Sequence, residues 1–486
     1  MKRQSFFNGK MLLTAMALSL VSATVLWSQE KMPITTSSRE ARELFLEGRQ
    51  QLENFQWQES YELMEKAIEL DPFFAMAYLY QSQAIGQGKG YYEEVLDKAY
   101  RLSELVSEPE KEWILYARAY QRRQKDAMKQ HVDAMRRLCP HDERLLNLMG
   151  WYHYQNGDYG NAAIYYERAT KENDQFHPAF KMLGESLMAL GKKEKAEPCF
   201  KRYVELLPGH PDPHMSYARF LKKGCRYNEA VQCYRQALDL DPHLGHAYKD
   251  LGDMALFQGK AQLAGHYYQD LYEHASTTAQ KFWALRLKAS VNLHEGKFKE
   301  AMQIMDEYAA LARKLRKPYY QFFSKAYQGL ILTEDGQMDQ GLKQYRDARK
   351  VLTKADMHEK LKERLITQAH LWEYNAMARN GCMDEPETVK CNCEEMLSEI
   401  EDPEQWEPYH RLCGVIEINK GNFRKARKYL KRSGDHPLTW YYMALANSKS
   451  GREKKARKWY RKIVEHHNNS IHLSSVRRQA LANVQE

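Results

Sequence analysis

A fixed interval of 34 residues constrains this sequence more than any other feature. Alanine recurs at that interval at Ala162, Ala196, Ala230 and Ala264. An aromatic residue keeps the same interval at Tyr166, Phe200, Tyr234 and Tyr268. Small residues do so at Gly150, Gly184, Ala218 and Gly252. Self-similarity at one period indicates a repeat architecture, in which each unit buries its apolar face only by stacking on the next.

Each repeat is expected to form two short helices joined by a turn. Apolar and small residues recur three and four positions apart over 145–155 and again over 159–171, which is the helical period. Residues 156–158 form the turn between them. In the next unit Pro208 closes the second helix, because proline cannot donate the following backbone hydrogen bond. The sequence therefore predicts an all-α fold, a superhelical solenoid of stacked antiparallel helix pairs.

The segment "FKMLGESLMALGKKEKAEPCFKRYVELLP" resembles the tetratricopeptide repeat (TPR) family. The positions that carry the resemblance are Gly184, Leu187, Gly191, Ala196, Phe200 and Pro208. A second copy keeps the pattern at Tyr248, Leu251, Gly252, Gly259, Ala264 and Tyr268, and a third at Trp440, Ala444, Gly451, Ala456 and Tyr460. The resemblance implies a solenoid whose first helices line a concave groove and bind protein or peptide partners.

The repeat phase divides the chain into segments, with eleven or twelve helix pairs expected in all. The segments are 41–278 with in-phase repeats (75–142 being degenerate), 282–356 with further repeats, 357–405 helical but out of phase, 407–470 with C-terminal repeats, and 471–486 as a tail.

The N-terminus differs from the repeats. Lys2, Arg3 and Lys10 precede an uncharged apolar run over 11–27. This order is typical of a signal peptide, and the run also reaches the lower limit for a membrane-spanning helix. Residues 1–28 are therefore expected to be a signal peptide or an N-terminal membrane anchor. The predicted location is periplasmic or secreted, or anchored to the membrane through residues 11–27.

Charge and motif content limit the classes of function that fit this chain. Removal of the three leader cations would lower the formal net charge from +9 to about +6. Between Lys420 and Arg478 the chain holds 17 Lys or Arg and three acids, which fits either a solvated face or a basic surface for acidic partners. No catalytic, phosphate-loop or metal-ligand pattern is present. We therefore expect a non-enzymatic protein without cofactor or metal.

The eight cysteines do not form a dense disulfide pattern. Cys199 and Cys233 occupy equivalent places in adjacent units, where packed helices stand too far apart for a disulfide. Cys382 could reach Cys391 or Cys393, and buried free thiols are the alternative.

The candidate binding residues are those that the resemblance places on the outward side of the first helices. They are Asn147, Trp151, Tyr154, Lys181, Glu185, Arg219, Lys222, Lys249 and Asp253. Trp151 fits an exposed anchor and a packed core residue equally well. The leading hypothesis is an exported scaffold or adaptor in envelope or secretory-space assembly. The alternative is an RNA-binding helical-repeat protein that uses the basic C-terminal surface; the leader argues against it, so no nucleic-acid partner is expected.

Overall fold

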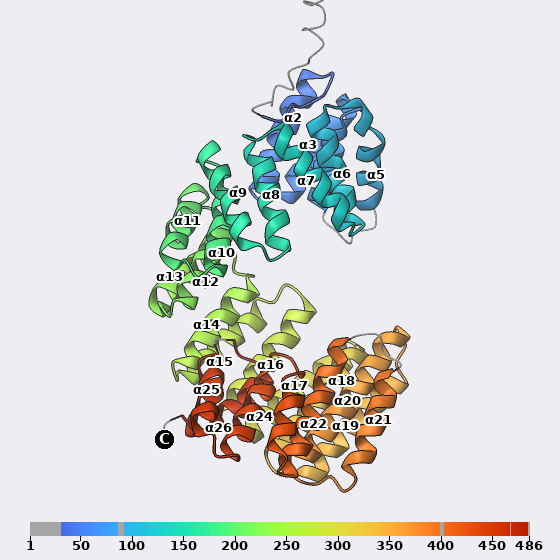
Figure 1. The fold of residues 1–486 in the computed structure, drawn as a ribbon, viewed down its shortest axis with the longest axis vertical. Helices are drawn as coiled ribbons and strands as arrows, with labels where there is room; N and C mark the ends of the chain where they lie inside the picture. Colours follow the sequence, from blue (N-terminus) through green and yellow to red (C-terminus); the bar gives the residue numbers. More distant parts are fainter. Residues whose placement is uncertain (1–30, 86–91, 399–402, 467, 485–486) are drawn as a thin grey trace, which may run out of the picture. The chain divides into compact units, whose positions relative to one another are not determined.

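The computed structural model describes residues 31–85, 92–398, 403–466 and 468–484. Within these ranges the regular structure consists of 25 α-helices, α2 to α26, and two short 3-10 helices, with no strand. The helices follow one another as antiparallel pairs (Figure 1), which confirms the predicted all-α repeat fold. The chain divides into two compact units, residues 1–240 and 241–486. The predicted leader, residues 1–28, lies outside the described ranges.

Unit 1 contains six helix pairs in its described residues. They are α2 (Arg39–Glu53) with α3 (Trp57–Leu70), α4 (Ala75–Ile85) with α5 (Tyr92–Arg101), α6 (Glu108–Gln121) with α7 (Lys125–Leu138), α8 (Glu143–Gln155) with α9 (Tyr159–Glu172), α10 (His177–Ala189) with α11 (Lys193–Leu206), and α12 (Pro211–Lys223) with α13 (Tyr227–Leu240).

The small residues of the 34-residue series make room for the aromatic ones. A Cβ atom added at Gly150 would lie 2.6 Å from the ring of Tyr166, and one at Gly184 would lie 2.8 Å from the ring of Phe200. Both rings are fully buried. Each glycine therefore lets the second helix of its pair press an aromatic ring against the backbone of the first.

Two segments near the start of unit 1 bind to later repeats. Backbone N–H groups in residues 31–38 donate hydrogen bonds to the carboxylates of Asp71, Glu110 and Asp142 at 2.8 to 2.9 Å. Asp71 lies between α3 and α4, Glu110 in the first turn of α6, and Asp142 directly before α8. The extended segment therefore joins three consecutive helix pairs.

The turn that follows α2 makes the second such contact. Glu53 accepts hydrogen bonds from Arg144 at 2.6 and 3.1 Å, and the ring of Phe55 stacks on His210 with centroids 4.8 Å apart. Asn54 and His177 are hydrogen-bonded at 3.1 Å. The first helix pair thereby contacts the fourth, fifth and sixth.

Unit 2 contains six more pairs and a final unpaired helix in its described residues. They are α14 (Gly245–Phe257) with α15 (Ala261–Glu273), α16 (Thr278–Glu295) with α17 (Phe298–Lys314), α18 (Pro318–Glu334) with α19 (Met338–Thr353), α20 (Glu359–Arg379) with α21 (Pro386–Ser398), α22 (Trp406–Asn419) with α23 (Phe423–Leu430), α24 (Pro437–Ser448) with α25 (Glu453–Val464), and α26 (Ile471–Ala482). The out-of-phase segment 357–405 thus forms the α20–α21 pair, whose first helix packs against α22.

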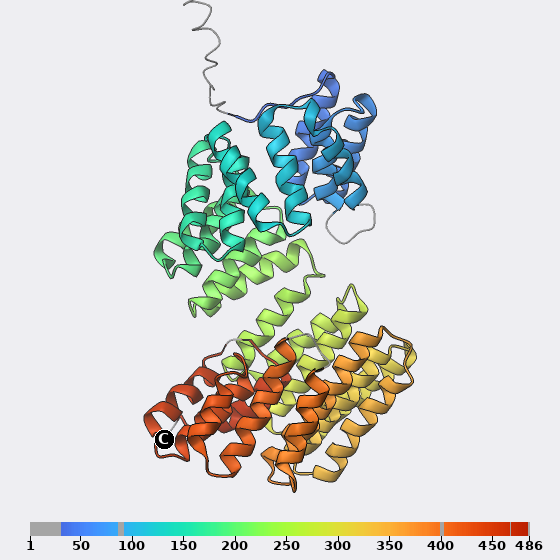
Figure 2. The ribbon, with the colours of Figure 1, turned by 45° about the vertical axis from the view of Figure 1, so that its right-hand side comes forward.

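The last helix returns to the beginning of unit 2. Helix α26 packs against α16 as well as against its neighbours α24 and α25. Figures 1 and 2 show these C-terminal helices, in red, beside α16. Leu473, Val476 and Ala480 are buried in that contact. The residues expected to form a tail are therefore an integral part of the unit 2 core.

No described helix combines the length and the apolar character that a membrane crossing requires.

Candidate functional site

The inner face of unit 1 carries seven of the nine predicted binding residues. Neighbouring first helices, such as α8 with α10 and α10 with α12, contact each other, as expected for helices on the inner side of a curved stack. The seven residues are Asn147, Trp151 and Tyr154 on α8, Lys181 and Glu185 on α10, and Arg219 and Lys222 on α12.

An aromatic pair stands out on this face. The rings of Trp151 and Tyr154 are nearly parallel, with an interplanar angle of 8° and centroids 6.2 Å apart. Both side chains are partly buried. Burial, and then the nearby carboxylate of Glu185, raises the pKa of Tyr154, so its hydroxyl remains a neutral hydrogen-bonding group. The pair offers a rigid apolar surface with a polar edge.

Charged residues on the next two helices stand beside this pair in the stack. Glu185 and Arg219 are partly exposed, and neither forms an ion pair with another residue in the described ranges. Trp, Tyr and Arg are the residue types enriched at energetically dominant sites of protein interfaces.

Three of the predicted residues are already engaged or enclosed. Lys181 forms an ion pair with Asp212 at 2.8 Å and lies 5.5 Å from the centroid of the Phe55 ring. Lys222 is buried, and the side-chain oxygen of Asn147 is buried without a hydrogen-bond partner in the described chain. These side chains contribute chiefly to the packing of the inner face.

The remaining two predicted residues, Lys249 and Asp253, lie inside unit 2. Their ion pair measures 2.6 Å, and Asp253, which is 0% exposed, also accepts a hydrogen bond from Tyr268 at 2.7 Å. Asn468 accepts a hydrogen bond from Lys249, and Asn469 donates one to Tyr268. The C-terminal segment of the chain thus covers the position at which repeat phase places a peptide contact.

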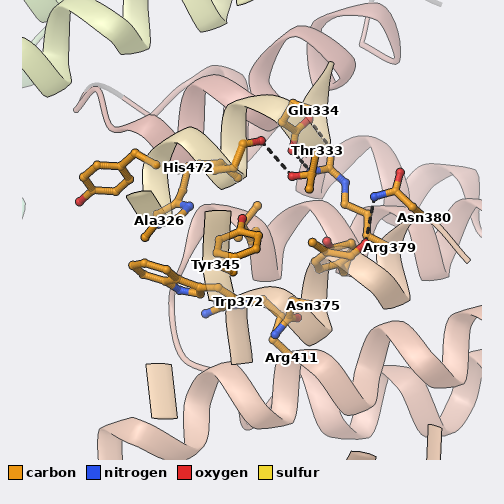
Figure 3. Close-up of a pocket in the computed structure, with 15 residues that line it drawn as sticks. Ala326, Thr333, Glu334, Tyr345, Trp372, Asn375, Arg379, Asn380, Arg411 and His472 are labelled. Atoms are coloured by element: carbon orange, nitrogen blue, oxygen red, sulfur yellow. Dashed lines mark hydrogen bonds and ion pairs between the residues drawn. The ribbon is translucent and has the colours of Figure 1, made fainter. Parts of the chain in front are cut away.

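A cavity of about 50 Å³ opens at the centre of unit 2 (Figure 3). Its walls come from α18, α19, α20, α22, α24 and α26. Beside the aromatic rings of Tyr327, Tyr345, Trp372 and Tyr442, the lining includes the polar side chains of Glu334, Arg379, Arg411 and His472. Repeat phase does not single out any of these polar residues, because each occurs once and only the curvature of the stack brings them together.

An open groove of about 1170 Å³ lies over α23, α24 and α25. Phe423, Met443 and Trp459 contribute apolar surface to it. Its exposed cations are Arg424, Lys425, Lys428, Lys431, Arg452 and Lys455. Lys425 is paired with Glu417 at 3.0 Å, whereas the other five form no ion pair within the described residues. We call this the basic groove; it gathers part of the predicted C-terminal charge into one hollow.

All eight cysteines are free thiols in the structure. Cys382 and Cys391 are exposed, while Cys393 is buried and its pKa is raised to about 12 by that burial. No cluster of three or more potential metal ligands occurs among the described residues.

Comparisons with known proteins identify the repeat. The family model described as "Tetratricopeptide repeat" matches residues 147–211 and 219–280. Over 104 residues the chain is 34% identical to human protein O-mannosyl-transferase TMTC2, a match that takes in 21% of this chain and 12% of that protein. The chain thus spans about an eighth of the length of this curated relative.

Solved structures of similar proteins are distant. Yeast Tom70 is 17% identical, with 88% of this chain and 99% of that chain covered and a TM-score of 0.42. MamA of Desulfovibrio magneticus RS-1 is 17% identical, with 35% and 96% covered and a TM-score of 0.33. YrrB, titled a TPR protein with an unusual peptide-binding site, is 19% identical, with 38% and 95% covered and a TM-score of 0.27.

Proposed function

The chain is a tetratricopeptide repeat protein, and from that premise we propose that it is an exported scaffold whose unit 1 holds segments of partner proteins on its inner face. Proteins of this family generally bind protein or peptide partners. The proposal assigns the docking role to α8, α10 and α12, and it assigns the place of action to a cell envelope or secretory space.

The observation that carries the docking role is the parallel pair Trp151 and Tyr154, followed along the stack by Glu185 and Arg219. Stacked rings lose little conformational entropy when a partner covers them, because packing already restricts their rotamers. The acid and the base on the neighbouring helices would then set the orientation of the bound segment.

In unit 2 the corresponding positions are covered by the C-terminal segment, which favours unit 1 as the docking site. Its helix α26 already packs against α16 and α24, and residues 468 and 469 cover Lys249 and Asp253. A partner would have to displace that segment to reach them. The inner face of unit 1 from α8 to α12 is the more accessible surface.

Export is proposed from the sequence alone. The cations Lys2, Arg3 and Lys10 followed by the apolar run 11–27 support it. N-terminal sequencing of the mature chain from its native cells tests this part. A start between residues 22 and 30 supports a cleaved leader, retention of Met1 in the membrane fraction supports an anchor, and retention of Met1 in the cytosol contradicts export.

Site-specific photo-cross-linking in the same cells tests the docking role. A photoreactive amino acid at Tyr154 should give discrete cross-linked species that a charge reversal at Arg219 weakens. The matched control carries the same amino acid at Ile164, which is 55% exposed on the second helix of the same pair. Equal cross-linking from positions 154 and 164, or none from position 154, would contradict the assignment.

RNA binding remains a second candidate because of the basic groove. Five unpaired cations beside Phe423 and Trp459 could accompany a phosphate backbone and stack on bases. Binding of single-stranded RNA that survives physiological salt and is lost when the groove charges are reversed would favour this candidate over the first.

A further inference from the structure

The central cavity of unit 2 is small, and two arginines but one carboxylate line it. About 50 Å³ accommodates a few water-sized groups. Within its walls, Arg379 faces Glu334, and the pair is held by two hydrogen bonds, one of them 3.0 Å long. Figure 3 shows this pair on one side of the cavity and Arg411 on another. The carboxylate of Glu334 thus neutralises Arg379, whereas no ion pair within the described residues neutralises Arg411.

Arg411 is buried and forms no ion pair with any residue in the described ranges. It is 6% exposed, and its Nε donates a hydrogen bond to the hydroxyl of Thr439 at 3.2 Å. The carboxylate of Glu407, one helical turn earlier, lies against Gly434 and is near enough to act electrostatically on Arg411, but it forms no ion pair with Arg411 within the described residues. A buried guanidinium with one neutral acceptor and a carboxylate beyond ion-pair distance leaves most of its five N–H donors without a protein acceptor and its charge only partly compensated.

The groups around Arg411 increase the positive character of the region. Burial lowers the pKa of Arg411 to about 10, which leaves the group protonated at neutral pH. Arg286 donates a hydrogen bond to the hydroxyl of Tyr327, and the charges of Arg286 and Arg411 help to lower the pKa of the neighbouring His472. His472 also has a buried Nδ1 without a hydrogen-bond partner in the described chain. One face of the cavity therefore presents donors and positive charge.

We propose that this cavity binds a compact oxyanion, a carboxylate or phosphate group, with Arg411 as its charge partner. The planar guanidinium can donate two parallel hydrogen bonds to two oxygens of such a group. His472 lies at the same cavity and can contribute to holding the anion. The apolar walls formed by Tyr327, Trp372 and Leu438 lower the local dielectric, which strengthens the interaction. This site is separate from the docking face of unit 1 and does not depend on it.

The volume sets the size of the group that enters. A few non-hydrogen atoms fill the cavity, so the bound moiety is a small free anion or the charged end of a larger molecule. A second cavity of about 210 Å³ adjoins it and shares the Glu334–Arg379 pair and Tyr442. The additional space fits the body of a molecule whose anionic end lies beside Arg411.

Thermal unfolding of the full chain at constant ionic strength tests the proposal, with acetate or inorganic phosphate replacing chloride. The unfolding temperature of unit 2 should rise by about 2 °C or more in at least one of the two anions. Arg411→Met should raise the temperature in chloride, because it removes an unpaired buried charge, and should abolish the extra rise. A response to acetate alone identifies a carboxylate site, and a response to phosphate alone a phosphate site.

Two further variants separate specific binding from other causes. Phosphate stabilises many proteins without binding them, so Arg313→Met, which removes an exposed arginine at the end of α17, should keep the full response. Thr439→Val removes the hydrogen bond to Arg411 but leaves the charge, and it should keep the response too.

Hydrogen exchange of the wild-type chain provides a test that does not depend on how well Arg411→Met folds. Anion should slow exchange in 406–419 and 437–448. The proposal is overturned if the anions raise the unfolding temperature of Arg411→Met as much as that of the wild type, or if neither anion raises that of the wild type. It is also overturned if the amides whose exchange slows lie outside 406–419 and 437–448.

Discussion

The side-chain amide of Asn469 donates a hydrogen bond to the hydroxyl of Ser290 at 2.5 Å, across 179 residues of chain. The same amide reaches the hydroxyl of Tyr268, and its oxygen accepts a hydrogen bond from Ser474. All four side chains are buried or nearly so. This small polar network fixes the C-terminal segment to the first repeats of unit 2, and α26 follows it directly into the core.

Removing this amide should lower the unfolding free energy of unit 2. Asn469→Leu removes the buried hydrogen bonds that the amide makes with the hydroxyls of Ser290, Tyr268 and Ser474, which costs about 1 to 3 kcal/mol of unfolding free energy. Denaturant unfolding of the full chain measures this loss. The matched control is Asn483→Leu in the exposed last turn after α26, expected to change stability by less than about 0.5 kcal/mol. Equal effects of the two substitutions would show that the network does not hold the segment.

Truncation of the chain tests the contact between the C-terminal segment and the first repeats of unit 2 more strongly. A chain that ends at residue 466 should expose the apolar surface that Ile471, Leu473 and Val476 cover, and it should bind an apolar fluorescent dye. A synthetic peptide of residues 468–484 added in trans should suppress that dye binding. A truncated chain that binds no dye and unfolds like the full chain would mean that α26 is dispensable for the core.

Packing within the repeat leads to a prediction in unit 1. Tyr166 is 0% exposed and fills the space that Gly150 leaves, so Tyr166→Ala should cost about 3 to 5 kcal/mol. Ile164→Ala, two residues earlier on the same helix, should cost less than about 1 kcal/mol because its side chain is largely exposed. Urea unfolding of both variants makes the comparison. Similar losses would contradict the assignment of the aromatic series to the core.

The repeat interval was sufficient to predict these pairwise contacts, since each joins residues within one 34-residue unit. The closing contacts could not be predicted in the same way. Glu53 meets Arg144, and Asn469 meets Ser290, only after several repeats have curved, and neither pair belongs to a periodic series. Arg411 is missed for the same reason: its significance depends on burial beside His472, which no spacing in the sequence expresses. The aromatic pair Trp151 and Tyr154 was accessible to prediction because it lies on a helix in full repeat phase.

Acid should destabilise unit 2 through partly buried histidines. Burial, followed by nearby Arg411, lowers the pKa of His472 from 6.5 to about 4. Between these values the unfolded chain binds a proton that the folded chain does not, so stability is complete above pH 6.5 and falls as the pH drops towards 4. This residue alone accounts for a loss of up to about 3 kcal/mol. His472→Gln, which cannot be protonated, should flatten the decline over that window.

Other histidines provide the comparison for that measurement. The control is His243→Gln, a substitution at an exposed position at the start of unit 2, which should leave the pH dependence unchanged. Unfolding free energies at pH 7, 5.5 and 4.5 decide the matter. An unchanged slope in His472→Gln would mean that other groups, such as the partly buried His436, dominate the acid response.

The basic groove should bind polyanions more strongly than the net charge of the protein alone would allow, because its cations lie close together. Exposed cations within about a Debye length of one another reinforce the local potential, so affinity for a single-stranded oligonucleotide or an acidic peptide should fall steeply between 50 and 200 mM salt. Reversal of two groove charges, Lys428→Glu with Arg452→Glu, should weaken binding by about tenfold or more. The control pair Lys193→Glu with Lys195→Glu changes the total charge by the same amount on exposed residues of unit 1. Fluorescence anisotropy across a salt series measures both pairs. If the control pair weakens binding equally, the groove acts only through net charge; if neither polyanion binds at 50 mM salt, the groove is a solvated face of the last helices.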